Sequence, residues 1–224
     1  MSHNISKHRL KHDEFADDMM RTANYMRKYS TEILAVLAGV LIIVIGLIFM
    51  SQNQAKNERQ ASLILGSAHA AMFSGDGQQA RRAYEDVIKR YASTESAKEA
   101  MIYLGNLHFQ SRDFAAAMEQ YQRAVKAKPH SSLLMAAALS GVGACKEQSG
   151  DIAGAAEIYM SIADRHSRDG YLAANALLSA GRCFRASGNL TRAREAYQMV
   201  VQKFPEDPSA QKAKEALAML PPLG

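Results

Sequence analysis

The sequence predicts an all-α protein in which one transmembrane helix is followed by a solenoid of about four α-helical hairpins and a closing helix. Two observations carry this prediction. Residues 33–50 form an uninterrupted run of 18 apolar residues, and beyond them small and aromatic residues recur every 38 positions. The composition agrees, because a chain of 224 residues that is 48% hydrophobic and only 7% aromatic suits one helical domain with an appendage.

The segment 1–32 is expected to contain a short amphipathic helix on the cytoplasmic side. Its apolar residues recur at helical spacing, at Phe15, Met19, Ala23 and Met26. Such a helix could lie on the inner leaflet or dock on a membrane partner, and the sequence leaves both open. His8 and His12 are four residues apart, but no third ligand accompanies them, so solvated histidines are expected instead of a metal site.

The apolar run 33–50 is expected to cross a membrane. At about 1.5 Å per residue its helix matches a hydrocarbon core in length. A buried core helix usually carries a polar stripe, and this run has none. A cleaved signal peptide is disfavoured by the long segment before the run and by the absence of a small-x-small site after it. We therefore expect an uncleaved signal anchor, with 51–60 as a linker or a continuing helix.

The basic residues near the run predict its orientation. The N-terminal side carries six of them, whereas the C-terminal side offers only Lys56 and Arg59 nearby. By the positive-inside rule the N-terminus stays in the cytoplasm and the rest of the chain lies outside. In a bacterium this places the residues after the span on the periplasmic side of the inner membrane.

An internal repeat organises residues 61–208. Three columns of residues share a period of 38: Gly105, Gly143 and Gly181; Ala117, Ala155 and Ala193; Tyr121, Tyr159 and Tyr197. The tripeptides at 111–113, 149–151 and 187–189 form a fourth column, Ser-Arg-Asp, Ser-Gly-Asp and Ser-Gly-Asn. An earlier copy, one residue short of the period, has Ser-Gly-Asp at 74–76. The chain thus contains four repeats.

Each column has a mechanical reason that predicts a helical hairpin. A glycine such as Gly143 lets two helices approach closely, and Asp151 or Asn189 can cap the helix after the turn. Tyr159 is expected to fill the space between neighbouring hairpins. Proline ends a helix, so Pro129 and Pro205 are expected to close the second helices of their units.

This pattern resembles the tetratricopeptide repeat. The second unit carries the match residue by residue, with Leu104, Gly105, His108, Ala117, Tyr121, Ala124 and Pro129. The resemblance implies a repeat domain over 61–220, including a closing helix over 209–220. It departs from the family pattern at Ala68, which stands where the first glycine would fall, and in a period that is four residues longer than usual.

The resemblance implies a concave groove, lined by the first helix of each hairpin, that binds a protein. Projected onto this chain, the groove residues are Leu65, His69, Met72, Phe73, Ile102, Asn106, Phe109, Ser140, Ala144, Glu147, Leu178, Arg182 and Arg185. This surface runs from apolar to basic, which suits an extended or partly folded polypeptide with acidic groups near Arg182 and Arg185. Relatives that clamp a terminal carboxylate have a lysine where this chain has Ile102, so that chemistry is not expected.

The layout of cytoplasmic helix, single span and external repeats is similar to the ancillary subunit family of the Sec translocon. That similarity implies a partner at the secretion channel or a periplasmic chaperone, with secreted polypeptides as further candidates. An envelope scaffold that coordinates outer-membrane or cell-wall assembly is the alternative. A mitochondrial import receptor with cytosolic repeats is a third possibility, against which the charge asymmetry argues.

Other function classes find little support in the sequence. It contains no Gly-rich phosphate loop, nucleophile elbow or paired metal ligands, so we expect no enzyme, cofactor, metal or small-molecule substrate. Lys and Arg exceed Asp and Glu by only 27 to 22 and form no basic stripe, which disfavours nucleic acid. Cys145 and Cys183 occupy equivalent sites in adjacent hairpins and are not expected to pair with each other.

Overall fold

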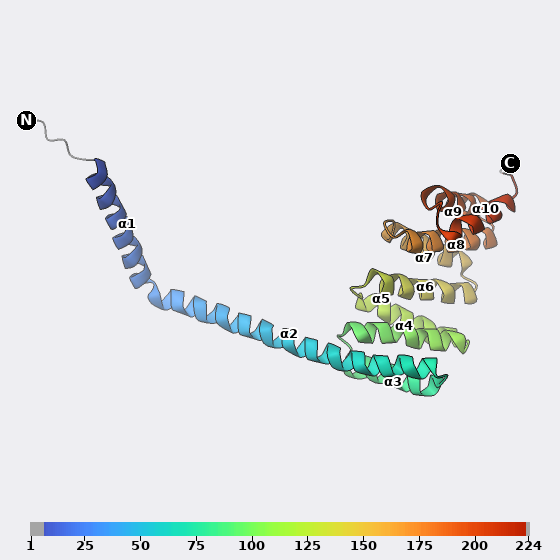
Figure 1. Ribbon diagram of the computed structural model, residues 1–224, viewed down its shortest axis with the longest axis horizontal. Coiled ribbons are helices and arrows are strands. Elements are labelled where there is room, and N and C mark those ends of the chain that lie inside the picture. Colours follow the sequence, from blue (N-terminus) through green and yellow to red (C-terminus); the bar gives the residue numbers. More distant parts are fainter. Residues whose placement is uncertain (1–6, 223–224) are drawn as a thin grey trace, which may run out of the picture. The chain divides into compact units, whose positions relative to one another are not determined.

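The computed structural model of the protein describes residues 7–222, with the side chains of 16–32 and 34–222, and these residues form ten helices and no strand (Figure 1). They belong to two compact units, Met1–Ala55 and Lys56–Gly224. The side chains of His8, His12 and Phe15 lie outside the described residues.

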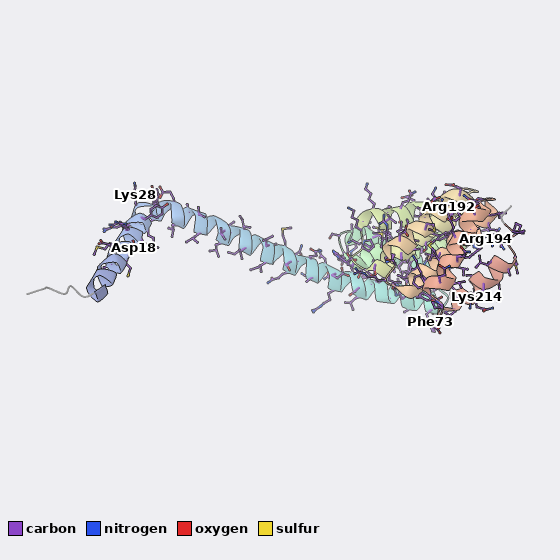
Figure 2. The ribbon with its side chains drawn as sticks, turned by 90° about the horizontal axis from the view of Figure 1, so that it is seen from above. Asp18, Lys28, Phe73, Arg192, Arg194 and Lys214 are labelled. Atoms are coloured by element: carbon purple, nitrogen blue, oxygen red, sulfur yellow. The ribbon has the colours of Figure 1, made fainter. Side chains whose placement is uncertain are left out.

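The first unit consists of α1 (Lys7–Lys28) and the first part of α2, a helix that runs from Ser30 to Phe73. An 18-residue window of α2 has a mean hydropathy of 3.2, and none of it is buried. Figure 2 shows side chains projecting from this part of the ribbon on all sides. By length and composition α2 can cross a membrane. Residues 51–60 continue α2 without a break.

The second unit is a stack of helical hairpins. The end of α2 pairs with α3 (Gly77–Arg90), and the next hairpins are α4 (Glu95–Gln110) with α5 (Phe114–Ala127), α6 (Ser132–Gln148) with α7 (Ile152–Arg165), and α8 (Gly170–Ala186) with α9 (Leu190–Lys203). Helix α10 (Pro208–Ala218) packs on α8 and α9. Helices α4, α6 and α8 also contact one another in that order (Figure 1). The predicted four-hairpin solenoid with its closing helix is confirmed.

The turn inside each hairpin follows from its tripeptide. In all four, the last residue caps the second helix by accepting the backbone N–H three positions on, at Asp76, Asp113, Asp151 and Asn189. The middle residue has a positive φ, between 83° and 85° at Gly75, Gly150 and Gly188. The second hairpin places Arg112 there, at φ 61°. Only glycine adopts this region without steric cost.

The glycine column receives the tyrosine column. A Cβ atom added to Gly105, Gly143 or Gly181 would lie 2.5–2.9 Å from the ring of Tyr121, Tyr159 or Tyr197 of the same hairpin. The predicted close helix crossing therefore has a specific cause, because the ring occupies the space that a side chain would need. Tyr121 fills a second such space in the next hairpin, where a Cβ on Gly141 would lie 2.5 Å from its ring.

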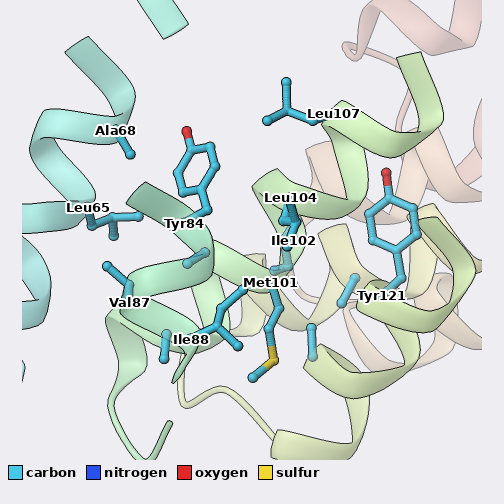
Figure 3. Close-up of a cluster of buried hydrophobic side chains, with 14 of the residues drawn as sticks. Leu65, Ala68, Tyr84, Val87, Ile88, Met101, Ile102, Leu104, Leu107 and Tyr121 are labelled. Carbon is cyan, nitrogen blue, oxygen red and sulfur yellow. The ribbon is translucent and has the colours of Figure 1, made fainter. Parts of the chain in front are cut away.

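The core lies between the helices of each hairpin and between neighbouring hairpins. Figure 3 shows its N-terminal part, where Leu65 and Ala68 of α2 meet Tyr84 and Val87 of α3. The carboxylate of Glu58 also accepts hydrogen bonds from the backbone N–H groups of Glu95 and Ser96, at 2.7 and 3.1 Å. The end of α2 is thus a full member of the repeat stack.

Candidate binding groove

A groove with a volume of about 510 Å³ runs across the first helices of the second, third and fourth hairpins. Helix α4 contributes Asn106 and Phe109, α6 contributes Ser140 and Ala144, and α8 contributes Asn175. Its other lining residues are Tyr121, Leu133, Ala136, Ala137, Gly141, Tyr159, Ile162, Leu172, Ala176 and Ser179. None of these side chains carries a charge at neutral pH. The groove is therefore apolar, with a few neutral groups that form hydrogen bonds.

Two tyrosines from the second helices contribute to the wall of the groove. The hydroxyl of Tyr121 donates to Oδ1 of Asn106 at 2.7 Å, which fixes the orientation of that amide. Desolvation by burial raises the pKa of Tyr121 to about 12, so its hydroxyl keeps its proton at neutral pH. The amide NH₂ of Asn106 remains a hydrogen-bond donor toward the groove.

Two residues predicted for the groove lie in the core, and both predictions are corrected. Leu65 is 6% exposed and Ile102 is 5% exposed. Leu65 follows Ala61 and precedes Ala68 on the face of α2 that packs into the N-terminal core. The first half of α4 is enclosed on nearly all sides, whereas its second half borders the groove. Ile102 is thus buried although Asn106, one turn later, lines the groove.

A second, smaller hollow gathers the other predicted residues of the first hairpin. His69, Met72 and Phe73 line a volume of about 320 Å³ together with Tyr84 and Tyr103. His69, Met72 and Phe73 were predicted from the sequence, whereas the two tyrosines were not. Tyr84 belongs to the repeated tyrosine column, and its distance of 15 residues from His69 matches that between Asn106 and Tyr121.

Arg182, at the basic end of the predicted surface, is paired with a carboxylate within the chain. Arg182 donates hydrogen bonds to Glu147 at 2.5 and 2.8 Å, and the hydroxyl of Tyr159 donates to the same carboxylate at 2.8 Å. Burial acts to raise the pKa of Glu147, but hydrogen bonds from Arg182 and Tyr159 lower it below its ordinary value. The ion pair makes Arg182 a poor site for an acidic group. Glu147, Leu178, Arg182 and Arg185 do not line the groove.

The missed groove residues share a signal that the sequence does contain. Leu133 and Ala137 lie three or four positions from each other or from the predicted Ser140 and Ala144, and so share one face of α6 with them. Leu172, Asn175 and Ser179 share a face of α8 in the same way. These missed residues are neutral, so no charge or aromatic ring distinguished them in the sequence. Among the described residues, no cluster of three His, Cys, Asp or Glu side chains could hold a metal ion.

Comparison with known proteins agrees with this geometry. The profile of a family described as a tetratricopeptide repeat-like domain matches residues 23–207. No curated protein sequence matches the chain.

Three solved structures show the similarity in fold. A tetratricopeptide repeat protein from Parabacteroides merdae has a TM-score of 0.59 at 12% identity, covering 71% of this chain and 59% of that one. BtubC from P. vanneervenii has a TM-score of 0.57 at 16% identity, covering 73% and 66%. MamA from Desulfovibrio magneticus has a TM-score of 0.54 at 16% identity, covering 71% and 92%. At these identities the likeness concerns the fold alone.

Proposed function

Because the chain belongs to the tetratricopeptide repeat-like domain family, we propose that it is a membrane-anchored protein–protein interaction module. The groove across α4, α6 and α8 is the single observation that carries this proposal. It is concave, largely apolar and built on helices that pack directly on one another, which are the properties of a site organised before its ligand arrives.

The lining of the groove suggests the chemistry of its ligand. Without charged side chains in the lining, specificity would come from shape and from neutral hydrogen bonds. Asn106 and Asn175 lie on α4 and α8, at opposite sides of the α6 surface, and side-chain amides can pair with the N–H and C=O groups of a peptide backbone. Phe109, Leu133 and Leu172 would contact apolar side chains. We therefore propose an extended or partly folded polypeptide as the ligand, bound without a catalytic step.

The anchor determines where such a module would work. The apolar part of α2 supports a single membrane span, and the excess of basic residues before it supports a cytoplasmic N-terminus. The repeats would then face the periplasm at the inner membrane. This placement supports a role beside a Sec translocon or a periplasmic chaperone, with scaffolding of envelope assembly as the alternative.

Site-specific photo-crosslinking in intact bacterial cells tests the proposal. A photoreactive phenylalanine analogue at Ser140, within the groove, is expected to crosslink to a translocon subunit, a membrane chaperone or secreted polypeptides. The same analogue at Gln122, exposed on α5, is the matched control. Adducts with outer-membrane or cell-wall assembly proteins would support the alternative role. Equal adducts from both positions, or none from Ser140, would contradict the groove as the binding site.

A further inference from the structure

The first hairpin breaks a hydrogen-bonding pattern that the next two hairpins keep. The hydroxyl of Tyr121 donates to Asn106 in the second hairpin, and that of Tyr159 donates to Glu147 in the third. In the first, the equivalent hydroxyl of Tyr84 is buried and has no hydrogen-bond partner among the described residues. The atom Nε2 of His69, on the residue equivalent to Asn106, is also buried there without a partner. Two polar atoms thus lack hydrogen bonds at one place.

Both side chains line the hollow of about 320 Å³ beside α2, α3 and α4, which we call the aromatic pocket. The ring of Tyr103 stacks on that of Tyr84, with centroids 5.7 Å apart and planes 12° apart, and the centroid of His69 lies 4.5 Å from that of Tyr103. Met72 and Phe73 complete the lining. Phe73 is 98% exposed, which is unusual for a large apolar side chain beside a hollow.

The electrostatics of the aromatic pocket favour a cation. The faces of aromatic rings carry partial negative charge and attract ammonium and guanidinium groups. No lysine or arginine lines the pocket. Desolvation by burial, with smaller contributions from Tyr103 and from the carboxylate of Glu99, raises the pKa of Tyr84 to about 12. Tyr84 therefore stays neutral, and Glu99 adds negative potential.

The unpartnered atoms exclude the simpler occupants. A purely apolar ligand would leave the Tyr84 hydroxyl and His69 Nε2 without hydrogen bonds, and burial of such groups is costly. A carboxylate would meet the ring faces and Glu99 with the wrong charge. An N–H donor that carries positive charge satisfies both conditions, because a tyrosine hydroxyl and an imidazole nitrogen can each accept a hydrogen bond from it.

We propose that the aromatic pocket binds a lysine or arginine side chain of a partner polypeptide. Its charged group would lie against the ring of Tyr103 and donate hydrogen bonds to the Tyr84 hydroxyl and to His69 Nε2, while Phe73 covers its aliphatic part. This inference rests on the proposed function, because it takes the chain to be a protein-binding module. It adds a second contact point, with a preference for positive charge, to the neutral groove.

Nuclear magnetic resonance of the full chain in detergent micelles, with ¹⁵N-labelled histidine, tests this. The probes are four acetylated and amidated tripeptides, Ala-X-Ala, in which X is lysine, arginine, norleucine or glutamate. The resonance of His69, assigned by comparison with His69→Gln, is expected to shift saturably with the lysine or arginine peptide. Norleucine has an aliphatic chain like that of lysine without the charge, and it is expected to bind at least tenfold more weakly. The glutamate peptide is expected to give no saturable shift.

Two variants with matched controls locate the contact. Tyr84→Phe removes only the hydroxyl and is expected to weaken the binding of the lysine or arginine peptide about fivefold, which corresponds to the loss of one typical hydrogen bond. Tyr197→Phe, the same change in the fourth hairpin and outside both the groove and the pocket, is expected to leave the affinity for that peptide unchanged. Phe73→Ala removes an exposed ring and is expected to weaken binding without lowering the melting temperature. Leu63→Ala, at a 71% exposed position of α2 outside the pocket, is its control.

Several outcomes would overturn the proposal. Equal affinity for the norleucine and lysine peptides would show that the pocket does not select positive charge. Preference for the glutamate peptide would show that it selects negative charge. No saturable shift with any peptide would mean that water alone satisfies Tyr84 and His69. Crosslinking from Ser140 probes the groove separately. Adducts there without cation binding would refute only the aromatic pocket, whereas cation binding without such adducts would refute only the groove.

Discussion

The guanidinium group of Arg182 on α8 donates two hydrogen bonds to the carboxylate of Glu147 on α6, over 2.5 and 2.8 Å. These residues are 35 positions apart, three fewer than the repeat period. The same separation joins Arg192 to Glu157, and Glu95 to His130. In these three pairs, a residue meets a partner nearly one helical turn before its equivalent position in the next hairpin. Glu58, by contrast, meets Glu95 and Ser96 at separations of 37 and 38 positions.

The first prediction concerns this pair. We expect Glu147→Gln to lower the free energy of unfolding by about 1–2 kcal/mol at pH 7, since it removes a charged acceptor of three hydrogen bonds. The side chain of Arg182 is 52% exposed, so solvent screening keeps the loss at the lower end. Urea unfolding of the full chain in detergent, followed by circular dichroism, measures the difference between the two proteins.

The pH dependence of that difference has a definite sign. The folded-state pKa of Glu147 lies below its ordinary value of 4.5, so its ionised form contributes stability that is fully present above pH 4.5. This contribution is lost as the pH falls through the lowered pKa of the folded state. The difference in the free energy of unfolding between the native chain and Glu147→Gln should therefore decrease as the pH is lowered. A difference that stays constant from pH 7 to pH 3 would contradict the lowered pKa of Glu147 in the folded state.

The second prediction tests the packing of tyrosine on glycine. A Cβ on Gly141 would lie 2.5 Å from the ring of Tyr121, closer than side chains pack, so we expect Gly141→Ala to destabilise the chain by about 1–3 kcal/mol. Gly66→Ala is the control, because nothing lies within 4 Å of its Cβ and alanine favours a helix by up to about 1 kcal/mol. Thermal melts should move in opposite directions. A stabilised Gly141→Ala variant would show that the ring moves aside freely.

The third prediction concerns the turn of the second hairpin. Arg112 has φ 61°, where the other three hairpins have glycine at the same position. We expect Arg112→Gly to stabilise the chain by about 1 kcal/mol, because glycine adopts this conformation without the clash of a Cβ atom. Gly150→Ala, at φ 85°, should have the reverse effect of similar size. Chemical unfolding measures the change in stability of each variant. A loss of stability in Arg112→Gly would contradict the prediction, because it would mean that a contact of the arginine side chain outweighs the backbone strain.

The fourth prediction is that Cys145 and Cys183 remain thiols in an oxidising compartment. Both are buried and free. Burial raises the pKa of Cys145 and raises that of Cys183 to about 11, so little reactive thiolate forms at neutral pH. Thiol titration of the native chain should find two thiols after denaturation without reductant, and much slower modification in the folded state. Finding none after denaturation would contradict the stacking of the hairpins.

The sequence predicted the repeat stack well because the residues that recur with the repeat period contact one another within one hairpin. Gly105 and Tyr121 recur with the period, since each hairpin must solve the same packing problem. Contacts between hairpins were not predicted, because the separations at which residues of neighbouring hairpins meet are revealed only by the stacked structure. For the same reason Arg182 was interpreted as a free charge in the groove, although it pairs with Glu147.

The candidate site was predicted less completely, for a related reason. Asn106 and Phe109 line the groove on α4, as predicted from the sequence, but Ile102 does not. Other helices surround the first half of α4, and the second half has one side open to the groove, so residues one turn apart differ in burial. Arg182→Glu would set two carboxylates against each other and disturb packing, so Phe109→Ala with Ser140→Trp is the better way to block the groove.

The last prediction concerns the topology of the proposed membrane anchor. Six basic residues precede the apolar run and two follow it nearby, so the residues after the span should lie in the periplasm. Alkaline phosphatase folds actively only where its disulfides form, and a fusion after Gly224 should therefore be active in a bacterium. If the chain is inserted through the Sec pathway, green fluorescent protein fused at the same position should be dark.

Charge reversal provides the matched control for this topology. Lys7, Arg9, Lys11, Arg21, Arg27 and Lys28 are replaced by Gln, and lysines are added at Gln52 and Gln54. These changes reverse the asymmetry, to no lysine or arginine before the span and four nearby after it, and leave the span intact. They should reduce phosphatase activity and raise fluorescence, because the span itself carries no preference for either orientation. An inactive phosphatase fusion of the native chain beside a bright fluorescent one would place the groove in the cytoplasm. The periplasmic partners would then be excluded, and only a cytoplasmic client could occupy the groove across α4, α6 and α8.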